Sequence, residues 1–196
     1  MQNGLFGLLI LFAITLASCQ ERLESPEESS VGAAAQEECG FVQNSYGARV
    51  SWKNKIPVTV QVDPQINEEF FNAAARAADR WNSLTGKKLI ALEKLPAEQK
   101  VDPTQDLTTG LYWRTDWAAE KNNQQAVTTL FYKGNTISEA DIKINAKDFN
   151  FYSNEPNSNR EVHMESLLVH EFGHLLGLKH SIIWPTVMWA TLAANT

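Results

Sequence analysis

Residues 170–180 read HEFGHLLGLKH and contain three of the four histidines of the chain. His170 and His174 are four residues apart, so on a helix their imidazoles lie one above the other on the same face. Gly177 follows three residues after His174, where a glycine can adopt a positive φ and end the helix. The chain can then turn and bring His180 back toward the pair. The spacing therefore predicts a helix around His170 and three imidazoles that meet where it ends.

Three imidazole nitrogens form a ligand set for catalytic zinc, whose fourth position stays open for water. Glu171 is rotated by roughly 100° from His170 around the helix. It is expected near the metal without being a ligand, which suits a general base acting on metal-bound water. The short HExxH pattern alone gives many false positives. The extended pattern with Gly177 and His180 is far more restrictive and favours a metal site.

A methionine, Met188, follows His180 by eight residues and ends the sequence PTVM. The long histidine motif followed by a methionine turn is the metzincin signature. This part of the chain resembles the metzincin metalloproteases, and the His-Ser pair at residues 180 and 181 is most similar to the matrixins. The resemblance covers roughly residues 50–190 and is strongest between residues 137 and 188.

The resemblance implies an α+β, metzincin-like catalytic domain. Its twisted, mainly parallel five-stranded sheet would have one antiparallel edge strand, a backing helix and an active-site helix. One catalytic Zn²⁺ would be held by His170, His174 and His180, with Met188 as a hydrophobic floor and no bond to the metal. Glu171 would take a proton from water and deliver it to the leaving amine. The expected activity is that of a zinc-dependent endopeptidase acting on a protein or peptide.

Two other functions are compatible with this sequence. A non-catalytic, zinc-binding surface lipoprotein would keep the fold as a binding module, although the intact Glu171 argues against it. A zinc amidase would use the same site to hydrolyse a non-peptide amide, such as one in the cell wall. The shape of the cleft, rather than the sequence, separates this amidase from a protease.

Length and charge limit the remaining functions. The chain has 196 residues, enough for one domain with a buried core. Its formal net charge of −6 argues against a nucleic-acid partner. We also expect the protein to be a monomer. Residues 20–38 hold six glutamates, one arginine and no aromatic residue. We therefore expect this acidic tract to be a flexible stalk.

The N-terminal sequence indicates export. Residues 4–18 form an apolar run that is shorter than the ~20 residues of a membrane-spanning helix and fits a secretory signal, although no basic residue precedes it. The sequence LASC at residues 16–19 resembles a bacterial lipobox, which implies cleavage before Cys19 and a lipid anchor on it. The alternative is an ordinary signal peptide in which Cys19 is incidental. Because Gln20 is not the aspartate that retains many lipoproteins at the inner membrane, the resemblance implies the cell envelope, at the outer membrane where one exists.

We expect a lipoprotein signal peptide at residues 1–18, followed by a lipidated N-terminus and flexible acidic stalk at residues 19–48. A metzincin-like zinc protease domain is expected at residues 49–196. Cys39 has no disulfide partner within the chain if Cys19 carries lipid. Cys39-Gly40 matches the end of the cysteine motif that keeps matrixin zymogens latent. Two glutamates precede it in place of proline and arginine, so a reduced thiol is the simpler interpretation.

The hydrophobic pattern predicts the sheet and its backing helix. Residues 56–62 alternate apolar and polar side chains, which is typical of a half-buried strand. Residues 67–85, with Leu84 in the apolar stripe, have helical spacing and end at Gly86. Further strands are expected at residues 88–92, 109–113, 126–132 and 140–145. In the matrixins the strand equivalent to residues 126–132 is the sheet edge along which the substrate lies, where a peptide can pair through backbone hydrogen bonds.

The active-site helix is expected from residue 159 to residue 176. Ser158, with Glu161 three residues later, matches a capping box. His163 lies seven residues before His170 and is expected to be a solvated surface histidine. Because it is the one histidine left over, the histidine-rich second zinc site of many matrixins cannot form. A Ca²⁺ site in the acidic or Asn-rich loops is compatible with the sequence, although no residue pattern supports it.

Overall fold

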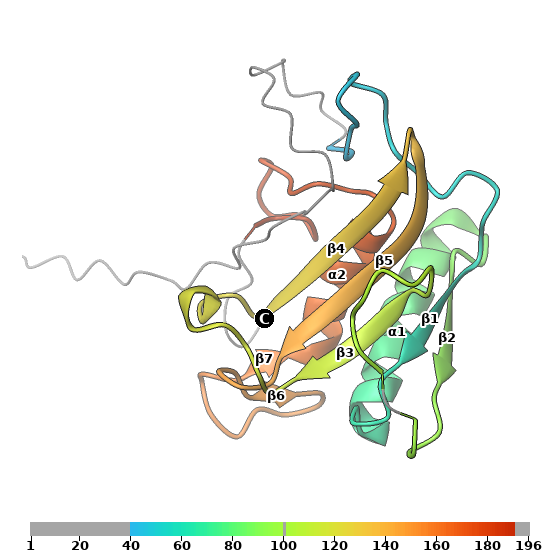
Figure 1. Cartoon of the computed structure of the whole chain (residues 1–196). Coiled ribbons are helices and arrows are strands. Elements are labelled where there is room, and N and C mark those ends of the chain that lie inside the picture. The colour runs from blue at the N-terminus through green and yellow to red at the C-terminus, as the bar shows by residue number, and fades with distance from the viewer. Residues whose placement is uncertain (1–39, 100, 191–196) are drawn as a thin grey trace, which may run out of the picture.

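A computed structural model describes residues 40–99 and 101–190 of the chain (Figure 1). The expected signal peptide, Cys19 and Cys39 lie outside the described residues. No helix within the described part of the chain is both long enough and apolar enough to cross a membrane.

One twisted sheet of five strands, in the order β2-β1-β3-β5-β4, forms the centre of the domain. Four strands run parallel: β1 (Val58–Val62), β2 (Ile90–Lys94), β3 (Gly110–Arg114) and β5 (Thr136–Asn145). The edge strand β4 (Ala126–Lys133) runs antiparallel to β5. Helices α1 (Glu68–Thr85) and α2 (Met164–Leu175) pack against each other behind the sheet. The predicted fold class, with its antiparallel edge strand and two helices, is confirmed.

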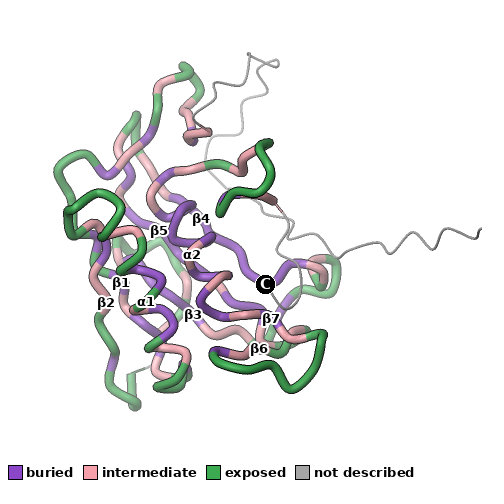
Figure 2. The backbone as a smooth tube through the Cα atoms, turned by 180° about the vertical axis from the view of Figure 1, so that it is seen from behind, coloured by how far each residue is buried: buried purple, intermediate pink, exposed green. Residues whose placement is uncertain are grey.

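The core forms where the sheet and the two helices face each other, and Figure 2 shows long exposed segments mainly in the loops. Strand β1 alternates as predicted, with Val58, Val60 and Val62 buried. Helix α1 buries a face of small residues: Ala73, Ala74, Ala77 and Ala78. Small side chains let the helix axis approach its neighbours closely. Leu84 does not join this face and is 77% exposed, because residues 83–85 at the end of α1 extend past the packed surface.

The ends of α1 are fixed by local chemistry. The Asn67 side chain accepts a hydrogen bond of 2.8 Å from the N–H of Phe70, as an N-cap does. Gly86 at the other end has φ of 62°, so the predicted glycine stop is confirmed.

Strand β5 begins at Thr136, four residues earlier than the sequence predicted. A tight turn at Gly134, whose φ is 61°, folds β5 directly back onto β4. Pairing with β4 therefore extends the strand beyond the apolar stretch that was visible in the sequence. A register shift between Phe131 and Tyr132 accommodates the hairpin.

The predicted start of the active-site helix at residue 159 is wrong, because α2 begins at Met164. The two preceding residues form β7 (Val162–His163), which pairs in parallel with β6 (Phe151–Tyr152). The capping box does not form either, since Glu161 instead accepts a hydrogen bond of 2.6 Å from the backbone N–H of Asn157. The backbone hydrogen bonds of the short β-ladder thus compete successfully with the first helical turn.

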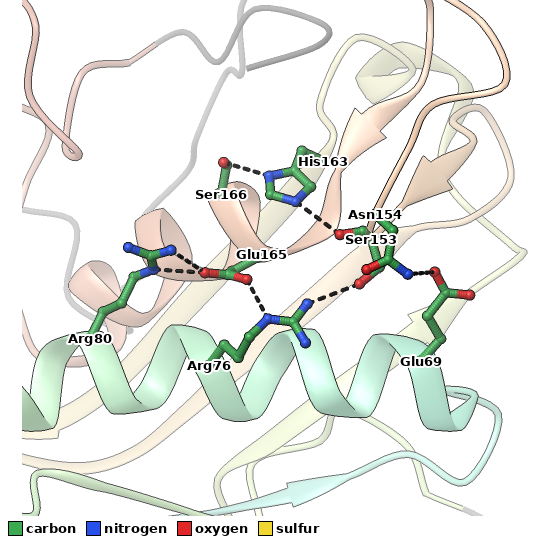
Figure 3. A network of polar contacts seen from close by, with 8 residues as sticks. All are labelled: Glu69, Arg76, Arg80, Ser153, Asn154, His163, Glu165 and Ser166. Carbon is green, nitrogen blue, oxygen red and sulfur yellow. Dashed lines mark hydrogen bonds and ion pairs between the residues drawn. The ribbon is translucent and has the colours of Figure 1, made fainter.

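His163 is half-buried rather than solvated, which corrects the prediction. Its Nε2 lies 3.2 Å from the carbonyl oxygen of Ser153, and its Nδ1 lies 2.9 Å from the hydroxyl of Ser166 (Figure 3). Because a carbonyl only accepts, Nε2 carries the proton and the Ser166 hydroxyl donates to Nδ1. His163 therefore ties the loop that contains Ser153 to the first turn of α2.

Ion pairs between a buried glutamate and two exposed arginines fasten the same turn of α2 to α1 (Figure 3). The side chain of Glu165 is 8% exposed and lies 2.5 Å from Arg76 Nε and 2.7 Å from Arg80 Nε. Burial by itself would raise the pKa of Glu165, but hydrogen bonds and charge from the two arginines hold it below its usual value. The start of the helix that carries the histidine motif is thus anchored at a defined position.

Residues 40–48, which the sequence assigned to the stalk, pack against the domain. The carbonyl of Gly40 accepts a hydrogen bond of 2.5 Å from the N–H of Lys179. The N–H of Val42 donates to the carbonyl of Gly177 at 2.9 Å, and the Val42 side chain is buried. The chain therefore joins the domain beside the segment that follows α2.

Asp141 on β5 is an unusual buried acid, with 1% of its surface exposed. Its pKa is raised to about 7, mainly by burial and also by the nearby Glu139 and Asp106 carboxyls. Polar contacts with the Gly110 backbone and the Tyr112 hydroxyl act in the opposite direction and offset part of this increase. The folded protein therefore favours the protonated form of Asp141.

We expect Asp141→Asn to stabilise the protein above pH 7. The pKa of the folded state is about 7, against a reference value of 3.8, so protonated Asp141 contributes stability that is lost as the pH rises between these values. Asparagine carries no charge, and the expected gain is about 1–3 kcal/mol at pH 8 and falls below about 1 kcal/mol at pH 4. Thermal unfolding at both pH values measures it, with the exposed Asp79→Asn as control. An equal effect at both pH values would contradict this account.

Candidate metal centre

Helix α2 carries two of the three motif histidines into the interior. His170 and His174 are 1% and 0% exposed and lie one turn apart. Two indole N–H groups hold the backbone of this helix: Trp81 Nε1 donates to the carbonyl of Val169 at 2.8 Å, and Trp52 Nε1 donates to the carbonyl of Leu175 at 2.7 Å. The histidines are therefore presented by a helix whose backbone is held at two points.

The end of α2 has the geometry that returns the chain to the histidine pair. Gly177 has φ of 93°, as predicted for a glycine that ends the helix. Its N–H donates to the carbonyl of His174 at 2.8 Å, and the N–H of Leu178 donates to the carbonyl of Gly173 at 3.0 Å. These two bonds define a Schellman motif. A residue with a side chain would be strained at this φ, so glycine is required for the turn.

The structure brings the three motif histidines together. His170 Nε2 lies 2.9 Å from His174 Nε2 and 3.3 Å from His180 Nε2. The ring centroids form a triangle with sides of 4.6, 4.9 and 5.2 Å. Among the described residues, this is the one group of three or more potential metal-binding side chains.

Hydrogen bonds at the outer ring nitrogens fix which nitrogen faces the centre. His170 Nδ1 lies 2.7 Å from the carbonyl oxygen of Val187, and His174 Nδ1 lies 2.7 Å from that of Leu178. A carbonyl accepts only, so each Nδ1 carries the proton and each Nε2 presents a lone pair. Backbone carbonyls orient metal-binding histidines in this way in many proteins.

The donor set fits zinc. Lone pairs this close together repel each other unless a proton or a metal ion lies between them. In a tetrahedral zinc site with Zn–N bonds of about 2.0–2.1 Å, the nitrogens lie about 3.3–3.4 Å apart. The separation of 3.3 Å between His170 and His180 matches that spacing, and the 2.9 Å separation is slightly shorter. Zinc binding by these residues stays a prediction that the geometry supports.

Met188 lies beneath α2, where a hydrophobic floor was predicted. Its side chain is 8% exposed, and a Cβ added at Gly173 would lie 2.2 Å from its Sδ. Gly173 therefore leaves the space that Met188 occupies. The Met188 carbonyl accepts a hydrogen bond of 2.6 Å from the N–H of Ser181, which ties the methionine turn to the residue after His180.

Glu171 is also buried, with 1% of its surface exposed. Its Oε2 lies 2.6 Å from the Oγ1 of Thr128 on the edge strand β4. Sequence reasoning missed Thr128, because no pattern links it to a motif that begins more than 40 residues later. The carbonyls of Val187 and Leu178 were missed as well, since backbone groups leave no signature in the residue types.

Two further features surround the centre. Strand β4 pairs with β5 on one side and with no other described strand, so it forms an open edge of the sheet. After His180 the chain exposes four large apolar side chains: Ile182, Ile183, Trp184 and Val187. The open edge strand β4 packs against the helix that carries two of the histidines. The exposed apolar residues follow the third histidine closely in sequence.

An α+β domain with three convergent histidines at the end of its second helix has the arrangement of a metalloprotease domain. Residues 51–196 match the family model described as Matrixin, and the chain belongs to the matrixin family. This family implies a zinc metalloprotease, and the three clustered histidines are a group that could bind a metal. The predicted resemblance is therefore confirmed at the level of the family.

A curated relative is consistent with this assignment. Metalloendoproteinase 2-MMP of Arabidopsis thaliana is 27% identical over 149 residues, which are 73% of this chain and 37% of that protein. The chain thus spans little more than a third of the length of the relative that it matches.

Proposed function

We propose that this chain is a zinc-dependent endopeptidase that hydrolyses peptide bonds in proteins or peptides. The observation that carries the proposal is the convergence of three Nε2 atoms, two of them fixed by hydrogen bonds at Nδ1, beside a buried glutamate. His170, His174 and His180 would hold the metal. Membership of the matrixin family supports the same reaction class.

Zinc at this position would lower the pKa of a bound water and polarise the scissile carbonyl. Glu171 follows His170 directly and projects from the next position around the helix. Its carboxylate takes the proton from the attacking water and returns it to the leaving amine. The carbonyls of Val187 and Leu178 keep two imidazoles oriented. Met188, whose side chain is buried, would form the hydrophobic floor of the site.

The open edge of β4 provides a way to bind an extended substrate. A peptide can pair with the backbone of such an edge, which requires little side-chain specificity. The α2 helix, which carries Glu171, packs against β4, and the Thr128–Glu171 contact connects the two directly. A peptide paired with β4 would therefore run past the catalytic glutamate.

Zinc content and peptide cleavage test this proposal together. We expect about one zinc per chain and endoproteolytic cleavage of a mixed peptide library. A chelator is expected to abolish both, and added Zn²⁺ to restore them, because ligands alone do not activate water. A zinc-loaded chain that hydrolyses a cell-wall amide but no peptide would contradict the peptidase assignment and favour an amidase. Bound zinc without hydrolysis of any amide would favour a binding module.

We also propose that the chain is exported and anchored in the cell envelope through lipid on Cys19. The support is the apolar run of residues 4–18 and the lipobox-like LASC sequence, both outside the described residues. Mass spectrometry of the mature N-terminal peptide is expected to find a lipidated cysteine. An unmodified N-terminus at any other residue would contradict it.

A further inference from the structure

Thr128 is a polar residue on a face of strand β4 whose neighbouring residues are apolar and buried. Side chains of a strand alternate between its two faces, so Ala126, Thr128 and Leu130 of β4 point to the same side. Ala126 and Leu130 are 0% and 1% exposed and belong to apolar clusters. Thr128, with 0% exposure, places a hydroxyl between them.

The hydroxyl of Thr128 is directed at one atom of the proposed active site. Its Oγ1 lies 2.6 Å from Glu171 Oε2, within the range of a charge-assisted O–H···O⁻ hydrogen bond. The carboxylate oxygen accepts and the hydroxyl donates. The same Oγ1 lies 3.5 Å from the backbone carbonyl of Glu171. A buried hydroxyl needs a partner, and the Glu171 carboxylate supplies it here.

A threonine holds this geometry more firmly than a longer polar residue would. Branching at Cβ restricts its χ1 angle, and the surrounding strand is part of a packed sheet. Fixing one carboxylate oxygen also fixes the plane in which the second oxygen of Glu171 lies. A catalytic base needs this restraint, because a small displacement of its carboxylate from the productive geometry slows proton transfer strongly.

We propose that Thr128 is a positioning residue that holds the Glu171 carboxylate in its productive orientation. The proposal rests on the proposed endopeptidase function, in which Glu171 moves the proton. It also couples the strand that is expected to pair with the substrate to the base that acts on it. The role does not involve contact between Thr128 and the substrate or the metal.

The test compares four variants of the full chain. Thr128→Val removes the hydroxyl and keeps the shape, Thr128→Ser keeps the hydroxyl, and Thr128→Ala replaces the valine variant if that does not fold. Thr109→Val is the matched control, because Thr109 is also a buried threonine, and its hydroxyl oxygen accepts a hydrogen bond of 3.1 Å from the N–H of Ala140. Each variant is examined for zinc affinity, thermal unfolding, kcat and KM.

We expect Thr128→Val to lower kcat by about 10- to 100-fold while KM and zinc affinity stay within about 3-fold. Thr128→Ser is expected to recover kcat to within about 3-fold of the wild type, since it restores the donor. Thr109→Val is expected to lower the melting temperature without lowering kcat. An unchanged kcat in Thr128→Val, or a serine variant as slow as the valine variant, would overturn the proposal.

Crystal structures of the zinc-loaded wild type and of Thr128→Val separate this proposal from the proposed function. We expect one carboxylate conformation of Glu171 in the wild type and a rotated or divided one in the variant. If the wild type cleaves no peptide, the proposed function fails. The conformation of Glu171 in the two crystal structures still tests whether Thr128 positions it. A Glu171 side chain that does not move in the variant would show that Thr128 does not position it.

Discussion

Replacing Glu171 with glutamine is expected to lower kcat for peptide cleavage by about 10²- to 10⁴-fold, with zinc still bound. Glutamine keeps the size of the side chain and can still meet the Thr128 hydroxyl, but it cannot accept a proton from water. The three histidine nitrogens are unchanged, so about one zinc per chain is expected in the variant. Single-turnover kinetics, together with metal analysis of the same sample, measures both quantities.

Glu165→Gln is a matched control for this result. It neutralises another buried glutamate on α2, but one that faces Arg76 and Arg80 rather than the histidines. We expect a lower melting temperature and an unchanged kcat, because only the bond between the helices is weakened. If Glu171→Gln retained wild-type kcat, the general-base role would be wrong, and another group would have to receive the proton.

Replacing His174 with alanine is expected to weaken zinc binding by about 10³-fold. Apparent binding free energies of protein zinc sites are about 10–16 kcal/mol, so losing one of three protein ligands removes roughly 3–5 kcal/mol. His174 is fully buried and fixed by Leu178, so no neighbouring side chain can replace it without rearrangement of the helix end. Competition with a chelator of known affinity measures the change, and activity should fall in proportion to bound zinc.

His163→Gln is the matched control among the four histidines. His163 bonds to Ser153 and Ser166 and lies outside the histidine cluster. We expect it to bind zinc as the wild type does, even if the protein unfolds at a lower temperature. Equal zinc affinities for His174→Ala and the wild type would show that the metal is held elsewhere.

Patterns within one element were enough to predict most of the fold. The alternation of apolar and polar residues predicted β1, and the helical spacing of residues 67–85 together with Gly86 predicted α1 and its end. The N-cap formed by Asn67 was not predicted and is seen only in the structure. The start of α2 was not predictable in this way. Residues 158–161 look like a helix start, but pairing of β7 with a strand about ten residues earlier determines the backbone there.

The candidate site also has a part that the sequence predicts and a part that depends on contacts between elements. The histidines and Gly177 lie within eleven consecutive residues, so helical geometry and one turn are sufficient to bring them together. Thr128 reaches Glu171 from another element, and its contribution depends on the register between β4 and β5 and on how α2 packs against the edge strand. Such contacts arise from the tertiary fold, and the residue pattern of the motif does not predict them.

X-ray absorption spectroscopy of the zinc-loaded chain tests the central claim most directly. Our account predicts one zinc per chain, with three imidazole nitrogens at about 2.0–2.1 Å and one oxygen from water. His174→Ala should lose one of the three imidazole contributions at matched zinc occupancy. A zinc that is bound through sulfur, or a spectrum that does not change in His174→Ala, would contradict the claim that His170, His174 and His180 form the catalytic metal centre.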